Sequence, residues 1–458
     1  MEPAKTDLLS IISPAKSRKS TPGLANGIST QYTQWYLRYL DFQFRQLSER
    51  EKHVLWGIQG NNNVQDAFYK TVAFVASQIT TVNRPSLQSI ATALLKENGL
   101  QTTGDNIINK IPPVVTKDDL ATLIFRVIGW LTMFLEIEPS QSHGSQFCVR
   151  EPTDTNGTAV DSEVFETYIQ PPDELARLPI HQLVKRFSQH IIPSSWLTSD
   201  FSFRALPGDP FSEQLVVSYL NFRALHKVAA IELEFVPYLG MHLEFDEESR
   251  RLKLFQFPSW CMILATSLSS RRHRRRSTGS DPRPYLASFL ENYFESRASE
   301  GKLEEYKANE LGIANLCGEV LLSYRMIFGQ DRKSAGTFNT IYKGHLDSTD
   351  GSETPSDSLL REVCGRYWKD VLIFQDIELA REKTQYSASK DFPFFRDRLV
   401  TLQRFVVEQD PNDLKTLLHD RRDILRYWTF WGVIYIGGLS IFLSIIQSII
   451  GILQIVLK

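Results

Sequence analysis

The spacing of hydrophobic residues changes twice along the chain, and each change marks a different kind of structure. Over residues 31–135, apolar and aromatic side chains recur every three or four positions, as they do on amphipathic helices. Over residues 216–257 the period is two, in the runs 231–236, 241–245 and 252–257, which predicts a small antiparallel sheet. Helical spacing then returns at 285–294, 303–328, 393–407 and 412–426. The pattern predicts an α+β fold in which helices dominate.

Two of the predicted helices carry signs of burial. The segment 118–135 is strongly apolar, although Arg126 and Gly129 lie near its middle. Because a central arginine is costly in lipid, we interpret this segment as a buried helix, with a second membrane span as the alternative. The segment 393–407 has one apolar stripe, expected to face a protein core, formed by Phe395, Leu399, Leu402 and Val406.

Composition suggests where the chain divides. Residues 1–28 are rich in Ser, Pro, Lys and Arg without apolar periodicity, which predicts a disordered segment. Further along the chain, composition and periodicity predict a helical region at 29–138, a polar linker at 139–162 and an α+β body at 163–426. The linker contains the sequon Asn156-Gly157-Thr158, which would stay unmodified in a cytosolic protein.

The C-terminal segment 427–457 has no charge and no histidine over 31 residues. A helix of that length reaches about 46 Å, which exceeds the ~30 Å hydrocarbon core of a bilayer. The excess is explained by its first turns, which carry the aromatic residues expected at the headgroup level: Tyr427, Trp428, Trp431 and Tyr435. The sequence therefore predicts a transmembrane helix that is buried in lipid over about 433–456 and ends at Leu457. A very apolar core helix of a soluble domain is the alternative.

The charges that flank this segment predict its orientation. Four basic residues precede it, and only Lys458 follows it; the four are Lys415, Arg421, Arg422 and Arg426. The positive-inside rule places such a basic flank in the cytoplasm. The first twenty residues also lack the apolar core of a secretory signal. We expect a single-pass, tail-anchored protein with its body in the cytosol, and the sequence does not indicate which organelle carries it.

One face of the predicted span is small and polar. Residues spaced by three and four share this face, which we call the seam: Gly437, Ser440, Ser444, Gln447, Gly451 and Gln454. Small residues let helices approach closely in lipid, and Ser or Gln can hydrogen-bond across the contact for about 0.6–2 kcal/mol each. The seam predicts association with a second copy or with another membrane helix. A tolerated scatter of small residues on a monomeric anchor is the alternative.

Composition and charge exclude several classes of protein. With 458 residues, of which 42% are hydrophobic and 23% charged, the chain is long enough for two or three domain-sized cores. Its net charge of −2 gives no global field that would steer it onto nucleic acid. The four cysteines have neither the spacing of a zinc site nor that of a disulfide framework, so we expect structural thiols: Cys148, Cys261, Cys317 and Cys364.

Candidate chemistry is sparse. His242, Glu244 and Asp246 lie at alternate positions of a predicted strand, so they could project together as metal ligands. The same alternation is typical of the solvent face of a half-buried strand, and this is the interpretation we favour. The sequence contains no phosphate-binding loop, zinc-protease motif, hydrolase elbow or deaminase signature. It therefore predicts no catalytic residue, no metal and no cofactor.

A dense basic run lies in a predicted loop at 270–282. The run contains Arg271, Arg272, Arg274, Arg275 and Arg276, and Ser277 follows it. Such a loop could bind anionic headgroups, act as a nuclear-import or nucleic-acid patch, or present Ser277 to an arginine-reading kinase. A solvated loop without a specific partner is the simplest interpretation.

Seven short strings follow one another in the second half of the chain: Leu220-Asn-Phe222, His242-Leu-Glu-Phe-Asp246, Phe257-Pro-Ser-Trp-Cys261, Ile327-Phe-Gly-Gln330, Asp391-Phe-Pro-Phe394, Asp420-Arg-Arg-Asp423 and Tyr427-Trp-Thr-Phe-Trp431. In this order they resemble a family of uncharacterised fungal proteins with a C-terminal membrane helix. The resemblance covers about residues 216–458. It implies that body and anchor form one unit, and it assigns no catalytic residue.

These features favour a C-terminally anchored membrane protein whose cytosolic body is a non-enzymatic adaptor or scaffold. A membrane-tethered enzyme with an unrecognised active site is the alternative, and a nuclear-membrane protein that uses the basic loop on nucleic acid is a third. The expected partners are the lipid bilayer and, through the seam, a membrane helix. Anionic lipid and nucleic acid are suggested only by the basic loop.

Overall fold

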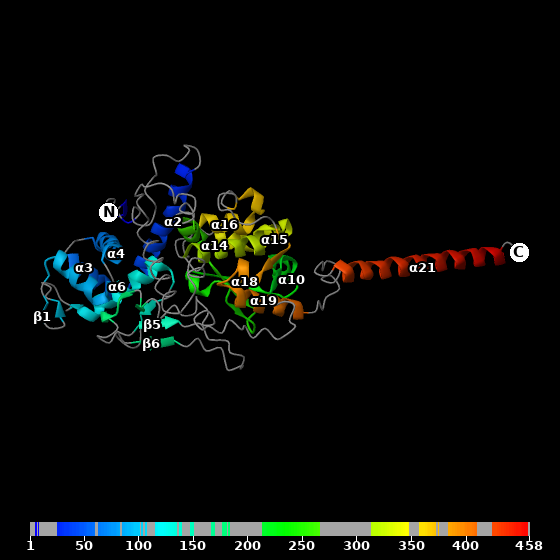
Figure 1. The fold of residues 1–458 in the computed structure, drawn as a ribbon. Helices are drawn as coiled ribbons and strands as arrows, with labels where there is room; N and C mark the ends of the chain where they lie inside the picture. Colours follow the sequence, from blue (N-terminus) through cyan, green and yellow to red (C-terminus); the bar gives the residue numbers. More distant parts are fainter. Residues whose placement is uncertain are drawn as a thin grey trace, which may run out of the picture.

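The protein has an α+β fold, as the hydrophobic pattern predicts (Figure 1). The computed structural model describes residues 5, 6, 8, 25–59, 63–82, 85–100, 102–103, 106–107, 115–134, 137–139, 147–150, 166–169, 176–180, 182–183, 213–265, 313–347, 357–371, 374, 383–409 and 424–456. Most of the predicted disordered segment and the whole basic loop at 270–282, together with its arginines, lie outside these residues.

The helical spacing of the N-terminal third is confirmed. It forms α2 (Ala25–Arg45), α3 (Glu49–Gln59), α4 (Val64–Thr81), α5 (Leu87–Glu97) and α6 (Lys117–Thr132). Side-chain oxygens cap four of these helices, because the first backbone N–H groups of a helix have no partner inside it. The capping residues are Ser48 of α3, Asn63 of α4, Ser86 of α5 and Thr116 of α6.

Helix α6 is a buried helix of the body, as predicted for 118–135, and not a second membrane span. Nearly all of its side chains are buried, including that of Arg126. The Arg126 guanidinium bonds the Glu51 carboxylate of α3 and lies over the Trp130 ring, 5.2 Å from its centroid. The charge near the middle of the helix is therefore neutralised by a partner within the protein.

Helix α2 joins the N-terminal helices to the rest of the body, and Figure 1 shows it in dark blue between the light-blue α3 and α4 and the yellow helices of the second half of the chain. The Trp35 ring stacks on Phe257, with centroids 4.5 Å apart, and Tyr36 stacks on Trp260 at 5.9 Å. The Tyr36 hydroxyl also donates to the Trp130 carbonyl of α6, at 3.1 Å. Buried residues from both halves of the chain consequently form one hydrophobic core.

The predicted central sheet exists, but it is mixed. Strand β8 (Glu232–Val236) pairs in parallel with β10 (Arg251–Phe255), which pairs antiparallel with β9 (Phe245–Asp246). The predicted strand 241–245 is wrong, because the 3-10 turn η2 (Leu239–Met241) comes first and Leu243 has a φ of 62°. An extended strand cannot pass through a left-handed residue, so the chain turns here and only the last two residues pair.

Three further pairings are small and antiparallel. They are β1 (Thr102–Thr103), β2 (Asn106–Ile107) and β3 (Val115–Thr116); β4 (Ile137–Pro139), β5 (Phe147–Arg150) and β6 (Glu166–Ile169); and β7 (Gln214–Val216) with β11 (Gln385–Ser387). The segment predicted as a linker therefore contains β5. The buried Gln403 amide continues the third ladder, because it accepts from Val216 N at 2.6 Å and donates to the Gln214 carbonyl at 2.8 Å.

Helices cover the central sheet. They are α9 (Val217–Leu220), α10 (Phe222–Lys227), α14 (Ile313–Tyr324), α15 (Arg332–Asp347), α16 (Ser358–Gly365), α18 (Ala388–Asp391) and α19 (Arg396–Glu408). The apolar stripe of 393–407 faces the core, as expected. The segment Arg325–Gly329, called η3, is π-helical and continues α14, so Gly329 closes a widened turn there.

The last helix is α21 (Ile424–Val456), which Figure 1 shows extending away from the body. It starts three residues before the predicted segment and is one continuous helix. Residues 412–423, which were predicted as helical, lie outside the described residues.

Candidate membrane anchor and buried polar groups

Helix α21 is long and apolar enough to cross a membrane. Its 33 residues reach about 50 Å, whereas a hydrocarbon core is ~30 Å thick. The most apolar stretch is Trp431–Ile450, with a mean hydropathy of 2.1, and none of it is buried against the body. Of the helices that the structure describes, this is the one candidate span. Since such a surface is unfavourable in water, α21 can act as a membrane anchor.

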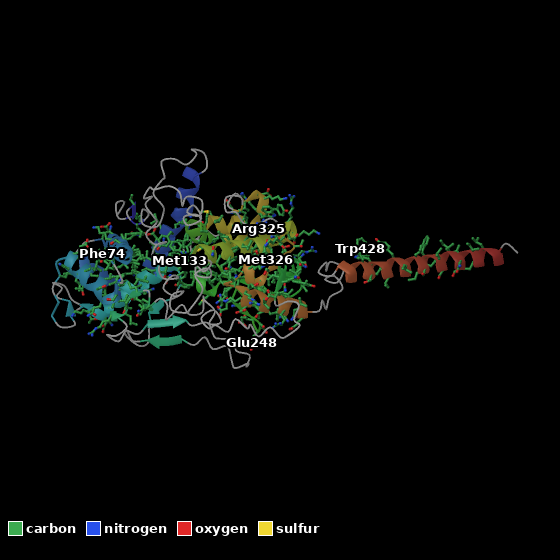
Figure 2. The ribbon with its side chains drawn as sticks, viewed as in Figure 1. Phe74, Met133, Glu248, Arg325, Met326 and Trp428 are labelled. Carbon is green, nitrogen blue, oxygen red and sulfur yellow. The ribbon has the colours of Figure 1, made fainter. Side chains whose placement is uncertain are left out.

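The predicted aromatic collar lies at the start of this span. Trp428, labelled in Figure 2, is 68% exposed, and Tyr435 is 71% exposed. The rings of Trp431 and Tyr435 lie 5.8 Å apart, one helical turn from each other. Amphipathic rings at one end of an apolar helix are suited to the headgroup region. The other end, Leu457, lies outside the described residues.

The seam residues lie on one face, because α21 continues without a break from Gly437 to Gln454. A Cβ added at Gly437 would meet nothing within 4 Å. The hydroxyls of Ser440 and Ser444 donate to backbone carbonyls four residues earlier, each at 2.9 Å. These serines are therefore satisfied within their own helix. The exposed Gln447 amide has no such internal bond among the described residues.

The structure does not bring His242, Glu244 and Asp246 together as ligands. His242 is fully buried, Glu244 pairs with Lys253 at 3.2 Å, and Asp246 accepts from Ser249 in the following turn. No cluster of potential metal ligands occurs among the described residues. The favoured solvent-face interpretation is also wrong for His242, because the left-handed Leu243 breaks the alternation between the two faces.

His242 instead belongs to a buried chain of hydrogen bonds. Its Nδ1 accepts from Phe255 N at 3.1 Å, so Nε2 carries the proton and donates to Ser323 Oγ at 2.8 Å. The Ser323 hydroxyl in turn donates to the Val320 carbonyl. Burial, followed by the charge of Arg398, lowers the pKa of His242 well below its usual range.

This pair cannot act as a nucleophile and its base. A catalytic histidine must accept the proton of the serine, whereas the His242 nitrogen here donates to the serine oxygen. Both side chains are also sealed from solvent. The bonds instead fix the turn before β9 against α14.

Glu319 lies on α14 one turn before Ser323 and is likewise buried. Its Oε2 accepts from the N–H groups of Phe394 and Phe395, at 2.9 and 3.2 Å, where α19 begins. Its Oε1 has no partner among the described residues. Burial raises the pKa of this carboxyl well above its ordinary value of 4.5, although the two hydrogen bonds act in the opposite direction. A proton on Oε1 leaves both bonds to Oε2 intact.

Replacing Glu319 with glutamine should make the body more stable than the unchanged chain at high pH. Because the pKa of Glu319 is higher in the folded chain, its stabilising contribution is complete below about pH 4.5 and is lost as pH rises through the folded pKa. Glutamine keeps an acceptor for Phe394 and Phe395 and cannot ionise. We expect near-equal unfolding free energies at about pH 4 and a more stable variant at about pH 8. A constant difference at both pH values would contradict the assignment.

Asp357 is the N-cap of α16 and is also buried. It accepts from Leu359 N of α16, at 3.0 Å, and from the N–H and hydroxyl of Ser259, at 2.7 and 2.6 Å. Burial raises the pKa of Asp357 to about 6, against the effect of these hydrogen bonds. Like Glu319, this carboxyl serves packing between elements.

Three cysteines are buried and free, as expected for structural thiols: Cys261, Cys317 and Cys364. Burial raises the pKa of the Cys261 thiol, and contact with Cys317 adds to the shift. Burial alone raises the pKa of Cys364. Since the thiolate is the reactive form, these thiols are protected from reaction both by their burial and by their protonation. The side chain of Cys148 lies outside the described residues.

Thiol labelling should therefore report unfolding of the body alone, because α21 contains no cysteine. In a Cys148→Ser background, we expect a maleimide to react at least about a thousandfold more slowly with the folded than with the unfolded chain, given stabilities of about 5–15 kcal/mol. Labelling followed over time in increasing urea measures this ratio. Fast labelling of any of the three without denaturant would show that the body opens locally.

Large apolar side chains are rarely exposed on the described body. Outside α21, those exposed among the described residues are Val82, directly after α4, and Ile341, in α15. The groups with the most strongly shifted pKa values, His242 and Glu319 among them, are enclosed in the core.

Nothing in the sequence marks His242, Glu319 and Asp357 as buried structural groups, because isolated polar residues carry no local signal of the element that will cover them. Comparison with family models, curated proteins and solved structures finds no match. The resemblance to fungal membrane proteins stays a prediction.

Proposed function

We propose that the chain is a single-pass membrane protein whose C-terminal helix anchors a cytosolic, non-enzymatic adaptor or scaffold body. The observation that carries this proposal is the 20-residue stretch of α21 that has no charged residue, is strongly apolar and is not covered by the body. So long an uncharged, apolar helix belongs in lipid or in the core of a large protein, and none of this stretch is buried.

The orientation rests on charge. The basic residues before α21 outnumber the single Lys458 after it, which favours retention of the body in the cytosol. The adaptor role is supported by His242, Glu319 and Asp357, three buried titratable groups that hydrogen-bond neighbouring elements of the body. It is also supported by the absence of recognisable catalytic motifs from the sequence.

The topology can be tested in a eukaryotic cell with two glycosylation reporters. The natural sequon at Asn156 reports the body, and a sequon added after Lys458 reports the other end. We expect resistance to alkaline extraction, modification of the added sequon and none at Asn156. Extraction at alkaline pH would overturn the anchor, and modification at Asn156 would overturn the orientation. An Asn156→Gln variant identifies the modified site.

We further propose that the seam pairs with a second copy of α21 or with another membrane helix. Because all copies share one orientation, Gln447 of each copy would lie at the same depth. An amide is both donor and acceptor, so two Gln447 side chains can satisfy each other in lipid.

Replacing Gln447 and Gln454 together with leucine should weaken helix association in a membrane reporter. At about 0.6–2 kcal/mol for each bond, we expect a loss of threefold or more. Ile446 and Leu453 lie off the seam, so an Ile446→Leu, Leu453→Ile variant is the control. Unchanged association of the double leucine variant would contradict the pairing.

A further inference from the structure

A group of cations and aromatic rings lies where η3, α15 and the short helix η4 (Trp368–Asp370) meet. The Arg325 guanidinium lies over the Trp368 ring at 4.2 Å, and Arg332 lies over Tyr367 at 4.8 Å. The Lys369 ammonium is 5.4 Å from the Trp368 centroid and 6.0 Å from that of Tyr367. We call these five residues the cation–aromatic corner.

The π-helical turn holds the inner side of the corner. Arg325 opens this turn and is fully buried, and Figure 2 labels it among the packed side chains of the body. Gly329 ends the turn, where an added Cβ would lie 3.2 Å from the Trp368 Cβ. A larger residue would push Trp368 outward. The indole is thus held between backbone and a buried cation, with a fixed orientation.

The outer side of the corner is exposed and basic. Tyr367 and Trp368 are half-buried, whereas Arg332, Arg366 and Lys369 are exposed. Residues 325–333 and 366–370 together contain four exposed basic side chains and two acidic ones, although the whole chain has a net charge of −2. One of the two acids, Asp331, is engaged by the N–H and hydroxyl of Ser334. The local surface is therefore positive.

A tryptophan and a tyrosine among lysine and arginine are the side chains that favour the headgroup region of a bilayer. We propose that the cation–aromatic corner docks the body onto anionic phospholipid headgroups. This inference rests on the proposed membrane anchor. Residues 410–423 connect α19 to α21, and 14 residues span at most about 50 Å. The corner is thereby kept at high effective concentration near the lipid surface, where weak contacts suffice.

Lipid is favoured over nucleic acid, the other polyanion that basic and aromatic side chains bind. Single-stranded nucleic acid needs a track of stacking platforms along a basic groove. Here both rings are stacked against cations of the same chain, so their faces are already occupied. Headgroups instead require exposed basic side chains around amphipathic rings, as the corner has.

The test uses the full chain in nanodiscs of phosphatidylcholine, with or without phosphatidylserine. Amide hydrogen exchange is followed in peptides covering 325–333 and 366–370. We expect slower exchange at 366–370 only with phosphatidylserine, and recovery in high salt, which screens exposed charges. Replacing Arg332, Arg366 and Lys369 together with glutamine should remove this protection, because each of these side chains should contribute about fivefold to the affinity for the anionic lipid surface.

A matched variant neutralises Lys96, Lys117 and Lys227, which are exposed elsewhere on the body, and should keep the protection. Equal exchange in the two lipids, or equal loss in both triple variants, overturns the proposal. Protection by single-stranded RNA in neutral nanodiscs, without protection by phosphatidylserine, overturns it in favour of nucleic acid. Co-flotation of the chain with vesicles tests the anchor separately, so the two failures can be distinguished.

Discussion

Replacing Trp35 with alanine is expected to lower the free energy of unfolding of the body by about 3–5 kcal/mol. Trp35 is 2% exposed, and its ring stacks on Phe257 with an interplanar angle of 20°. Alanine would remove that stack and leave a cavity in the shared core, because the backbone of α2 is held by its neighbours Tyr36 and Tyr39.

The location of Trp35 gives this change a second expected effect. Since α2 packs against α6 and against residues 257–260, the variant should destabilise both halves of the chain together. Hydrogen exchange of amides in α4 and α14, measured in the full chain in mild detergent, reports the two halves. Loss of protection in α4 alone would show that the halves unfold separately, as two domains would.

Two variants control for this prediction. Trp35→Phe keeps an aromatic ring and removes an indole N–H that has no acceptor among the described residues, so it should cost less than half as much. Trp56→Ala removes a half-buried indole of α3 and should also cost less than half as much. Equal losses from Trp35→Ala and Trp56→Ala would contradict the role assigned to the stack.

Replacing Arg126 with methionine is the second change expected to have a large effect, also about 3–5 kcal/mol. It would leave the Glu51 carboxylate buried, with Ser48 as its remaining donor. An uncompensated charge in the core is far more costly than the pair that it came from. Protection of Cys261, Cys317 and Cys364 against thiol labelling in urea measures the loss.

The double variant Arg126→Met, Glu51→Gln should recover much of that stability. Glutamine can still accept from Ser48 in the capping box, and no charge remains buried. Arg50→Met is the matched control, because its side chain is 64% exposed and its bond to Asp119 should contribute less than about 1 kcal/mol. If Arg126→Met instead stabilised the chain in lipid, α6 would be a membrane span after all.

Elements with strong local periodicity could be predicted from the sequence. The helical character of residues 31–135, the strands β8 and β10 and the buried stripe of α19 were all visible in the spacing of apolar residues. The long apolar helix α21 was also predictable, because absence of charge over a long stretch needs no knowledge of neighbours. The strand predicted at 241–245 failed, because alternation of side chains does not reveal a left-handed backbone at Leu243.

The buried polar groups could not be predicted, because their partners lie far away in sequence. His242 and Ser323 are 81 residues apart, Asp357 and Ser259 are 98 apart, and Glu319 bonds backbone groups 75 residues onward. Each residue alone is an ordinary polar residue of a helix, turn or cap. Its role follows from the element that packs against it.

The sequence by itself determined the long apolar helix at the C-terminal end, the helical character of the chain and the burial of most apolar stripes, since these depend on periodicity and on transfer of side chains out of water. Only the tertiary structure decided that α2 unites two halves in one core, that Arg126 is balanced by Glu51, and that His242 donates to Ser323 and so cannot be a base. Those outcomes depend on the distances between groups that are far apart in the sequence, and the order of residues does not set these distances. Hydrogen bonds and ion pairs act over a few ångströms, so folding alone brings such groups together.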